Sequence, residues 1–202
     1  MNRGAIKTPR GRPKTLNRDH ILEVAMFAYW QIGTRDVSIN EICRKANVSK
    51  PGLYREFGNE DGLMTAVLLA YLKKVLIPLL AILQSDRSFG EVLDELTSFI
   101  AEERPEQRMP KGCLMVKMRE SKMLLGEDTQ AQITKSHKRI LTMYETWIQR
   151  CKDKGDFPSD ITPAFAAIYI DAQLTNALAQ LARGEERAMV KSVLETSLSV
   201  LR

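Results

Sequence analysis

Residues 37 to 57, VSINEICRKANVSKPGLYREF, constrain the fold of this chain more than any other segment, because they contain two helix starts separated by one turn. Ser38 and Glu41 have the spacing of a capping box, in which each side chain bonds a free backbone N–H in the first turn of a helix. Ser49 supplies a second N-cap, and Pro51 suits a first turn that has no N–H bond to lose. The segment therefore predicts two short helices joined by a tight turn.

Apolar residues fall on one side of each predicted helix. Ile39, Ile42 and Ala46 are spaced three or four apart, as the buried face of a helix requires, and Leu53 and Phe57 follow the same rule in the second helix. The residues predicted to face outward are Lys50, Gly52, Tyr54 and Arg55. Two short helices with a tight turn and a polar outer face are typical of a DNA-reading helix-turn-helix.

Two stretches around this segment resemble a known family. KANVSKPGLYREFGNEDGL, residues 45 to 63, is similar to the DNA-binding signature of the tetracycline-repressor (TetR/AcrR) family of bacterial regulators, and RDHILEVAMFAYWQIGT, residues 18 to 34, resembles its first helix. Together they cover roughly Leu16 to Val67. The remainder resembles the family in helical layout and in a KGCLMV segment, Lys111 to Val116, of the kind that some branches carry.

The resemblance implies a set of DNA-facing positions, in which Arg or Lys bonds guanine, Asn pairs with adenine and a Tyr hydroxyl holds phosphate. These positions are Ser38, Asn40, Ser49, Lys50, Pro51, Gly52, Tyr54 and Arg55. The chain departs from the family pattern with Gly52 in place of a frequent threonine, Glu56 in place of a histidine and Glu60 in place of a lysine. Two acids are therefore expected near phosphates that cations usually hold.

The net charge of +5 is unevenly distributed. Residues 1 to 58 contain 11 Lys or Arg and 5 acids, whereas residues 59 to 202 contain 19 and 20. This asymmetry predicts an N-terminal module that binds a polyanion, double-stranded DNA, on a nearly neutral body. Residues 1 to 14 contain five cations and no acid, spaced by Gly and Pro, and are predicted to be a disordered basic arm. In it, Arg10, Arg12 and Lys14 either enter a narrow A·T-rich minor groove or make weak phosphate contacts.

Helical periodicity extends to the end of the chain. The first helix is capped by Thr15 or Asn17 and ends at Gly33, while Phe27 and Trp30 lie off its buried stripe and are candidates to pack on the following helices. Further helices are predicted over about 59–84, 88–103, 112–125, 127–154 and 162–182, and after Gly184.

These elements predict an all-α fold of about nine helices. An N-terminal three-helix helix-turn-helix DNA-binding domain, residues 15–58, is followed by a C-terminal helical ligand-binding and dimerisation domain, residues 59–202, with 59–84 as the connecting helix. Pro78 inside that helix is expected to kink it, as a plain bend or as a hinge. The last two helices have extra apolar surface, which predicts a four-helix bundle formed by a homodimer.

Several classes of protein are disfavoured. No apolar run approaches the ~20 residues of a membrane span, and the N-terminus lacks the apolar stretch of a signal, so a cytoplasmic protein without a membrane partner is expected. The three cysteines lack CxxC or Cys/His spacing, which argues against disulfides and a metal site, and no cofactor is expected. Two histidines, with no phosphate-binding glycine loop and no GxSxG, argue against an enzyme.

A methionine-rich part of the second domain is a candidate effector pocket, because methionine adapts to irregular apolar ligands. The candidate lining residues are Cys113, Met115, Met118, His137, Met143, Tyr144, Trp147, Phe165 and Tyr169. Ordinary core packing also explains each of these residues singly, and a histidine on an apolar stripe is usually a hydrogen-bonded core residue.

Cys113 carries a sharper hypothesis. It follows Gly112 at a predicted helix start, between Lys111 and Lys117, where the helix dipole can lower the pKa of a thiol. Some relatives with a comparable Gly-Cys segment respond to electrophiles or oxidants through cysteine. The alternative is a buried, inert thiol.

The combined prediction is a dimeric transcription regulator, a repressor that a small-molecule effector releases from a palindromic operator. Two alternatives use the same DNA-binding module. One is a thiol-based redox or electrophile sensor that switches through Cys113, and the other is an architectural DNA-binding protein without an effector.

Overall fold

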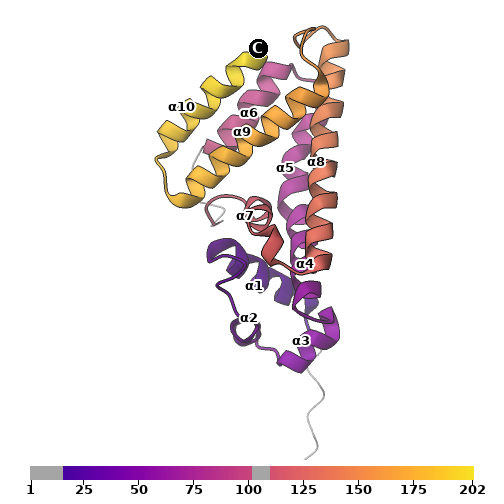
Figure 1. The fold of residues 1–202 in the computed structure, drawn as a ribbon, viewed down its shortest axis with the longest axis vertical. Coiled ribbons are helices and arrows are strands. Elements are labelled where there is room, and N and C mark those ends of the chain that lie inside the picture. The colour runs from indigo at the N-terminus through magenta and orange to yellow at the C-terminus, as the bar shows by residue number, and fades with distance from the viewer. Residues whose placement is uncertain (1–15, 102–109) are drawn as a thin grey trace, which may run out of the picture.

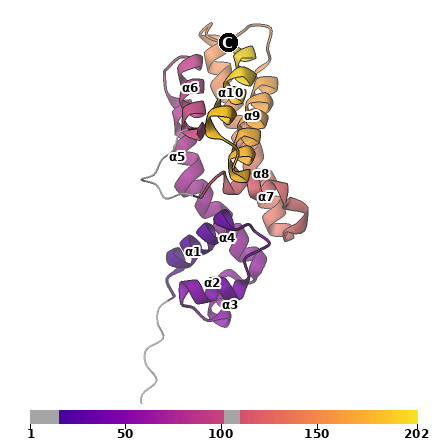
Figure 2. The same ribbon diagram turned by 90° about the vertical axis from the view of Figure 1, so that its left-hand side faces the viewer.

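The computed structural model describes residues 16–101 and 110–202, which form helices joined by short loops (Figure 1). One end of the molecule holds the helices within residues 18–57, and the other end holds a bundle of later helices, as Figure 2 shows from the side. The α-helices are α1 (Arg18–Gln31), α2 (Ile39–Ala46), α3 (Lys50–Phe57), α4 (Glu60–Tyr71), α5 (Ile77–Leu80), α6 (Phe89–Ala101), α7 (Leu114–Glu120), α8 (Glu127–Asp153), α9 (Pro163–Arg183) and α10 (Arg187–Leu198). With the continuous stretch Glu60–Gln84 counted as one, nine α-helices lie in the described ranges, so the predicted all-helical fold is confirmed.

Side-chain caps fix the starts of the first three helices. Asn17, one of the two predicted caps, accepts a hydrogen bond of 3.1 Å from the His20 N–H. Ser38 caps α2 and Ser49 caps α3 through bonds of 3.2 Å each, as predicted. The carboxylate of Glu41 forms an ion pair of 2.8 Å with Lys45, so the observed cap at this helix start is the serine bond.

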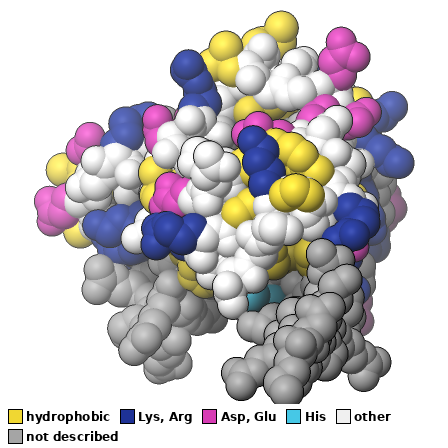
Figure 3. Space-filling view, turned by 90° about the horizontal axis from the view of Figure 1, so that it is seen from below, with side chains coloured by type: hydrophobic (Ala, Val, Ile, Leu, Met, Phe, Trp, Pro, Cys, Tyr) yellow, Lys and Arg dark blue, Asp and Glu magenta, His cyan; other side chains and the backbone are white. Residues whose placement is uncertain are grey.

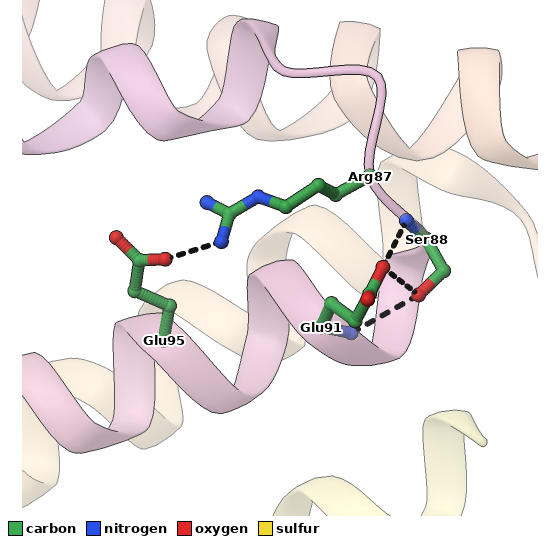
Figure 4. Close-up of polar contacts among 4 residues, drawn as sticks. All are labelled: Arg87, Ser88, Glu91 and Glu95. Carbon is green, nitrogen blue, oxygen red and sulfur yellow. Dashed lines mark hydrogen bonds and ion pairs between the residues drawn. The ribbon is translucent and has the colours of Figure 1, made fainter.

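The start of α6 shows a complete capping box (Figure 4). The Glu91 carboxylate accepts bonds from the backbone N–H of Ser88, at 2.9 Å, and from its hydroxyl, at 2.7 Å, while the Ser88 hydroxyl accepts the Glu91 N–H at 3.3 Å. Arg87 and Glu95 form an ion pair beside it. These two bonds to the carboxylate lower the pKa of Glu91. A four-residue sequence signal therefore sets this helix start without help from distant residues.

The connecting stretch Glu60–Gln84 is helical throughout but irregular in the middle. Pro78 has no backbone N–H, and a proline ring clashes with the carbonyl four residues earlier, here that of Lys74. The turn Leu72–Leu76 is correspondingly π-helical, and the Ile77 N–H bonds the Leu72 carbonyl five residues back. The disturbance that the proline predicted is thus a widened turn just before it.

This stretch also qualifies the expectation drawn from the apolar runs. Among the described residues, it is the one helix long and apolar enough to cross a membrane by length and composition alone. It carries exposed Lys73 and Lys74 near its middle, and its first part packs against α1 and α8. Through those contacts, the stretch is packed as part of the helical fold.

Asp61 in the first turn of α4 joins this helix to the start of α8. Its carboxylate accepts the backbone N–H groups of Asp128, at 2.9 Å, and Thr129, at 3.0 Å, and it also bonds the Thr129 hydroxyl. A Cβ on Gly126 would lie 2.1 Å from the Asp61 carboxyl carbon, so glycine is required for this approach. The helix that follows α3 therefore caps a helix of the bundle.

We expect Asp61→Ala to lower the free energy of unfolding by about 1–3 kcal/mol, because two helix-start N–H groups lose a charged acceptor. Urea unfolding followed by circular dichroism measures the change. The matched control is Asp160→Ala, which removes an exposed carboxylate in the loop before α9 and should leave stability unchanged. An equal effect of the two substitutions would contradict the capping role.

Candidate nucleic-acid interface and internal cavity

Helix α3 lies at the end of the molecule, where its neighbours hold it closely on both sides (Figure 1). Asn47, in the left-handed region with φ of 54°, makes the turn after α2. Leu53 and Phe57 are buried beneath α3. At the other side, a Cβ on Gly62 would lie 2.0 Å from the Phe57 carbonyl oxygen, so α4 begins directly against the end of α3. These contacts make α3 a rigidly mounted surface helix.

Six of the eight described positions to which the resemblance assigned DNA contacts are exposed. They are Ser38, Asn40, Ser49, Lys50, Pro51 and Arg55. Tyr54 is half-buried, and the Lys50 ammonium lies 5.4 Å from the centre of its ring. Figure 3, which views this end of the molecule, shows Lys and Arg side chains spread over the face. The exposed positions are thus available to a partner.

The prediction that Gly52 faces outward is wrong. Gly52 is buried, and a Cβ there would lie 3.0 Å from the Ser49 hydroxyl and 3.4 Å from the Leu16 side chain. The reason is the cap itself, because the Ser49 side chain folds back over Gly52 to accept its N–H. Gly52 accordingly supplies room for the cap.

The acids that depart from the family pattern have different surroundings. Glu56 forms an ion pair of 3.1 Å with Arg18 of α1, whose guanidinium also lies 5.3 Å from the centre of the Phe57 ring. Glu60 is exposed in the first turn of α4, where the helix dipole favours a carboxylate. The charge of Glu56 is therefore offset within the chain. The predicted arm residues Arg10, Arg12 and Lys14 lie outside the described residues.

A cavity of about 210 Å³ lies inside the other part of the molecule. Residues from the α4–α5 stretch, α6, α7, α8 and α9 line it, together with Trp30 of α1. Of the nine predicted pocket residues, it brings together Cys113, Met115 and Tyr144. The leucine-rich part of the wall, including Leu76, Leu79 and Leu174, was not among the predicted residues, because leucines at helical spacing look the same in any core.

The other six predicted residues do not line this cavity. Met118 is fully buried in the core, Trp147 stacks on Phe89 with ring centres 4.9 Å apart, and Met143 is half-buried elsewhere on α8. Phe165 is 59% exposed, and Tyr169 donates its hydroxyl to the Ser197 carbonyl of α10. His137 contacts Asp171 behind the cavity wall. A helical stripe predicts that residues are buried without specifying which neighbour they meet, so the sequence could not assign residues to this cavity.

One corner of the cavity is polar. Asp171, on α9, accepts a bond of 3.2 Å from Arg119 of α7 and contacts the His137 ring nitrogen at 2.8 Å. Arg119 also donates to Thr175 at 3.4 Å. Burial alone would raise the pKa of Asp171, but the bond to His137 and the charge of Arg119 lower it overall. Asp171 is therefore an ionised group that fixes two other polar side chains.

Cys113 lies at the N-cap of α7, as predicted, but its chemistry differs from the hypothesis. It is 6% exposed, and the hydroxyl of Tyr71 donates to its sulfur at 3.1 Å. Burial raises the pKa of the thiol more than that bond and the start of α7 lower it. The helix dipole acts on a desolvated group here, so the net effect is opposite to the predicted one. Within the described residues, no cluster of His, Cys, Asp or Glu is suited to a metal ion.

Trp30, which belongs to α1, connects the cavity to the part of the molecule that holds α1, α2 and α3. Its indole N–H donates to the Gly112 carbonyl at 3.2 Å, its ring packs edge-on against Tyr71 at 5.0 Å, and the Lys117 ammonium bonds its backbone carbonyl. Gly112 has a φ of +79°, and a Cβ there would lie 2.7 Å from that of Ala182 on α9. A residue of α1 is thus part of the cavity wall and is fixed to the segment that begins α7.

Residues 21–67 match the model of the bacterial regulatory proteins of the tetR family. The chain is 32% identical over 112 residues to the HTH-type transcriptional repressor ComR of Escherichia coli, an alignment that covers 55% of this chain and only about half, 53%, of ComR. It is 26% identical over 188 residues to the repressor BdcR of the same organism, covering 92% of this chain and 94% of BdcR.

A solved structure shares the whole fold. A cysteine mutant of the TetR-family regulator CifR, complexed with 26 bp double-strand operator DNA, superposes with a TM-score of 0.79 at 22% identity, covering 95% of this chain and 100% of that one. The family match lies on α1 to α4, where the exposed helix α3 is mounted, and the fold likeness extends over the remaining helices. Residues 21–67 therefore carry the domain of the bacterial regulatory proteins of the tetR family, and the chain is similar in sequence to two transcriptional repressors.

Proposed function

We propose that this protein is a homodimeric transcriptional repressor that a small molecule releases from a palindromic operator. Residues 15–58 would form its DNA-binding domain, and residues 59–202 its effector-binding and dimerisation domain. The observation that carries the proposal is the double role of Trp30, which belongs to α1 and also lines the cavity. A molecule that fills the cavity meets the DNA-binding helices directly, and a shift there changes the spacing of two α3 helices.

The DNA-binding half of the proposal is supported by the exposed positions on α2 and α3. Lys50 and Arg55 offer cations for guanine or phosphate, Asn40 offers an amide for adenine, and the Tyr54 hydroxyl offers a phosphate contact. ComR and BdcR are repressors by name, and CifR carries operator DNA in its solved complex. If this chain has the same role, we expect it to act in the cytoplasm and to have no enzymatic activity.

The dimer is supported by apolar surface on the last two helices. Phe165 and Ile168 of α9 are 59% and 60% exposed, and Met189 and Val193 of α10 are 62% and 41% exposed. Large apolar side chains clustered on two neighbouring helices favour burial against a second copy. Phe165 and Tyr169, predicted as pocket residues, would contribute to this interface instead.

Neither alternative is favoured by the described residues. A thiol sensor needs an accessible sulfur of low pKa, whereas Cys113 is buried and its pKa is raised. An architectural DNA-binding protein has no use for an internal cavity with a fixed polar corner.

Duplexes selected from random DNA should be palindromic, with half-sites about 34–36 Å apart or a multiple of that distance.

On the selected duplex, Lys50→Ala and Arg55→Ala should each weaken binding by about 1–3 kcal/mol, because each removes a cation from the exposed face of α3. Fluorescence anisotropy measures the affinity. Lys138→Ala, which removes an exposed lysine of α8, is the control and should bind as the unsubstituted protein does. Selection of no preferred duplex would contradict the proposed function.

Deleting residues 2 to 14 should weaken operator binding and make it less dependent on salt, because five cations are lost. Each lost phosphate contact should reduce the slope of log affinity against log salt by about one. Titrations between low and moderate salt measure both quantities. Unchanged affinity and slope would show that the basic arm contributes nothing to binding.

Iodoacetamide should alkylate Cys113 at least about tenfold more slowly in the folded protein than in urea, because the reactive thiolate is both buried and disfavoured at neutral pH. Peptide mapping by mass spectrometry measures the rate for each cysteine separately, and the unfolded sample is the internal control. Rapid alkylation of Cys113 in the folded protein would support the sensor hypothesis. That hypothesis also predicts that an electrophile does not release the Cys113→Ser variant from DNA.

A further inference from the structure

Arg119 has unused hydrogen-bonding capacity in the polar corner of the cavity. It makes both of its bonds, to Asp171 and to Thr175, through one nitrogen, Nη1. Its Nε and Nη2 donors have no hydrogen-bond partner among the residues that the structure describes. These two donors form the side of the guanidinium that matches the two oxygens of a carboxylate.

Tyr144 provides a second, independent group at the same place. It lines the cavity, is only 5% exposed, and its hydroxyl makes no hydrogen bond within the described part of the chain. Burial, followed by the negative charge of Asp171, raises the pKa of this phenol, so it keeps its proton and acts as a donor. The Tyr144 hydroxyl is not one of the enclosed polar atoms that lack a partner, so it is accessible and can donate a hydrogen bond to a ligand in the cavity.

The balance of charge around the cavity favours a negative ligand. Among the described residues that line it, Lys111 and Arg119 are cationic and Asp171 is acidic, while a further cation, Arg187, has an interaction of its own. Arg119 and His137 already contact that carboxylate through one of its oxygens, Oδ2. An incoming anion therefore meets Lys111 and Arg119, and the carboxylate of Asp171 is already paired.

The rest of the wall determines the body of the ligand. It is built mainly from aliphatic side chains such as Leu76, Leu79, Ile140 and Leu174, which offer no hydrogen bonds. A cavity of about 150 Å³ holds benzene, so the volume here suits a body of roughly eight carbon atoms.

We propose that the cavity binds a small organic monoanion, a carboxylate with an apolar body, held by the Nε and Nη2 donors of Arg119 and by the Tyr144 hydroxyl. The inference rests on the proposed function in one respect, that this cavity is the effector site. It adds the chemical class of the effector and the two side chains that recognise its head group.

Three probes with the same chain and different head groups test the class: octanoate, 1-octanol and octylamine. Trp30 lies in the wall, so its fluorescence in a full-length Trp147→Phe variant reports binding, and calorimetry on the unsubstituted protein checks that this background behaves normally. Octanoate should bind at least about tenfold more tightly than octanol, because a charge-assisted pair replaces a neutral bond, and octylammonium should bind most weakly.

Substitutions then assign the recognition to named side chains. Arg119→Gln should remove the advantage of octanoate over octanol while leaving octanol affinity within about twofold, since the aliphatic wall is untouched. Tyr144→Phe should weaken octanoate about fivefold, as expected for one lost hydrogen bond. Arg139→Gln, which removes an exposed arginine of α8, is the matched control and should change nothing.

Equal binding of octanoate and octanol, tightest binding of octylammonium, or no binding of any probe would overturn the inference. Loss of octanol binding in Arg119→Gln would also overturn it, because the substitution would then act on the cavity as a whole. Octanoate that binds through Arg119 but leaves the operator complex intact supports the anion site and contradicts release by this effector. The two proposals can therefore fail separately.

Discussion

The contact between Trp30 and the segment that begins α7 is the interaction on which the two ends of this molecule depend. The indole N–H bonds the Gly112 carbonyl while Lys117 bonds the carbonyl of Trp30 itself, so the end of α1 and the start of α7 are held from both sides. Gly112 lies against Ala182 of α9, which leaves the segment little room to move independently. Packed contacts of this kind change between discrete arrangements more readily than they deform gradually.

A second joint, at Asp61, couples the same two ends by a different route. The carboxylate belongs to the first turn after α3, and it caps α8, whose side chains also form part of the cavity wall. The hydroxyls of Thr65 and Thr129 meet at 3.0 Å one turn further along. Since both joints meet the helices that carry α3, a change in cavity shape has two short paths to the DNA-facing end. The π-helical turn at Leu72–Leu76 follows that joint along the same continuous helix, where the helix is least regular.

The polar corner of the cavity illustrates how burial and neighbouring groups together set the charge state of a residue. On sequence alone, Asp171 is one acid on a mostly apolar helix. In the fold it is held by Arg119 and His137 and keeps its charge despite burial. Cys113 shows the opposite outcome, because the same wall that surrounds it removes the water that a thiolate requires. The start of α7 does lower the pKa of the Cys113 thiol, as the sequence predicted, but desolvation raises that pKa by more.

The amino-acid sequence by itself determined the elements whose causes lie within four residues. The caps at Ser38, Ser49 and Ser88, the turn before α3 and the distortion before Pro78 all follow from local bonds or from one missing N–H. Only the tertiary structure decided which residues meet across long separations. The Arg119–Asp171 pair spans 52 positions and the Trp30–Gly112 bond spans 82, and the burial of Gly52 depends in part on Leu16. Helical periodicity specifies a buried face without naming its neighbour, so the membership of the cavity and the pKa of its thiol were set by packing.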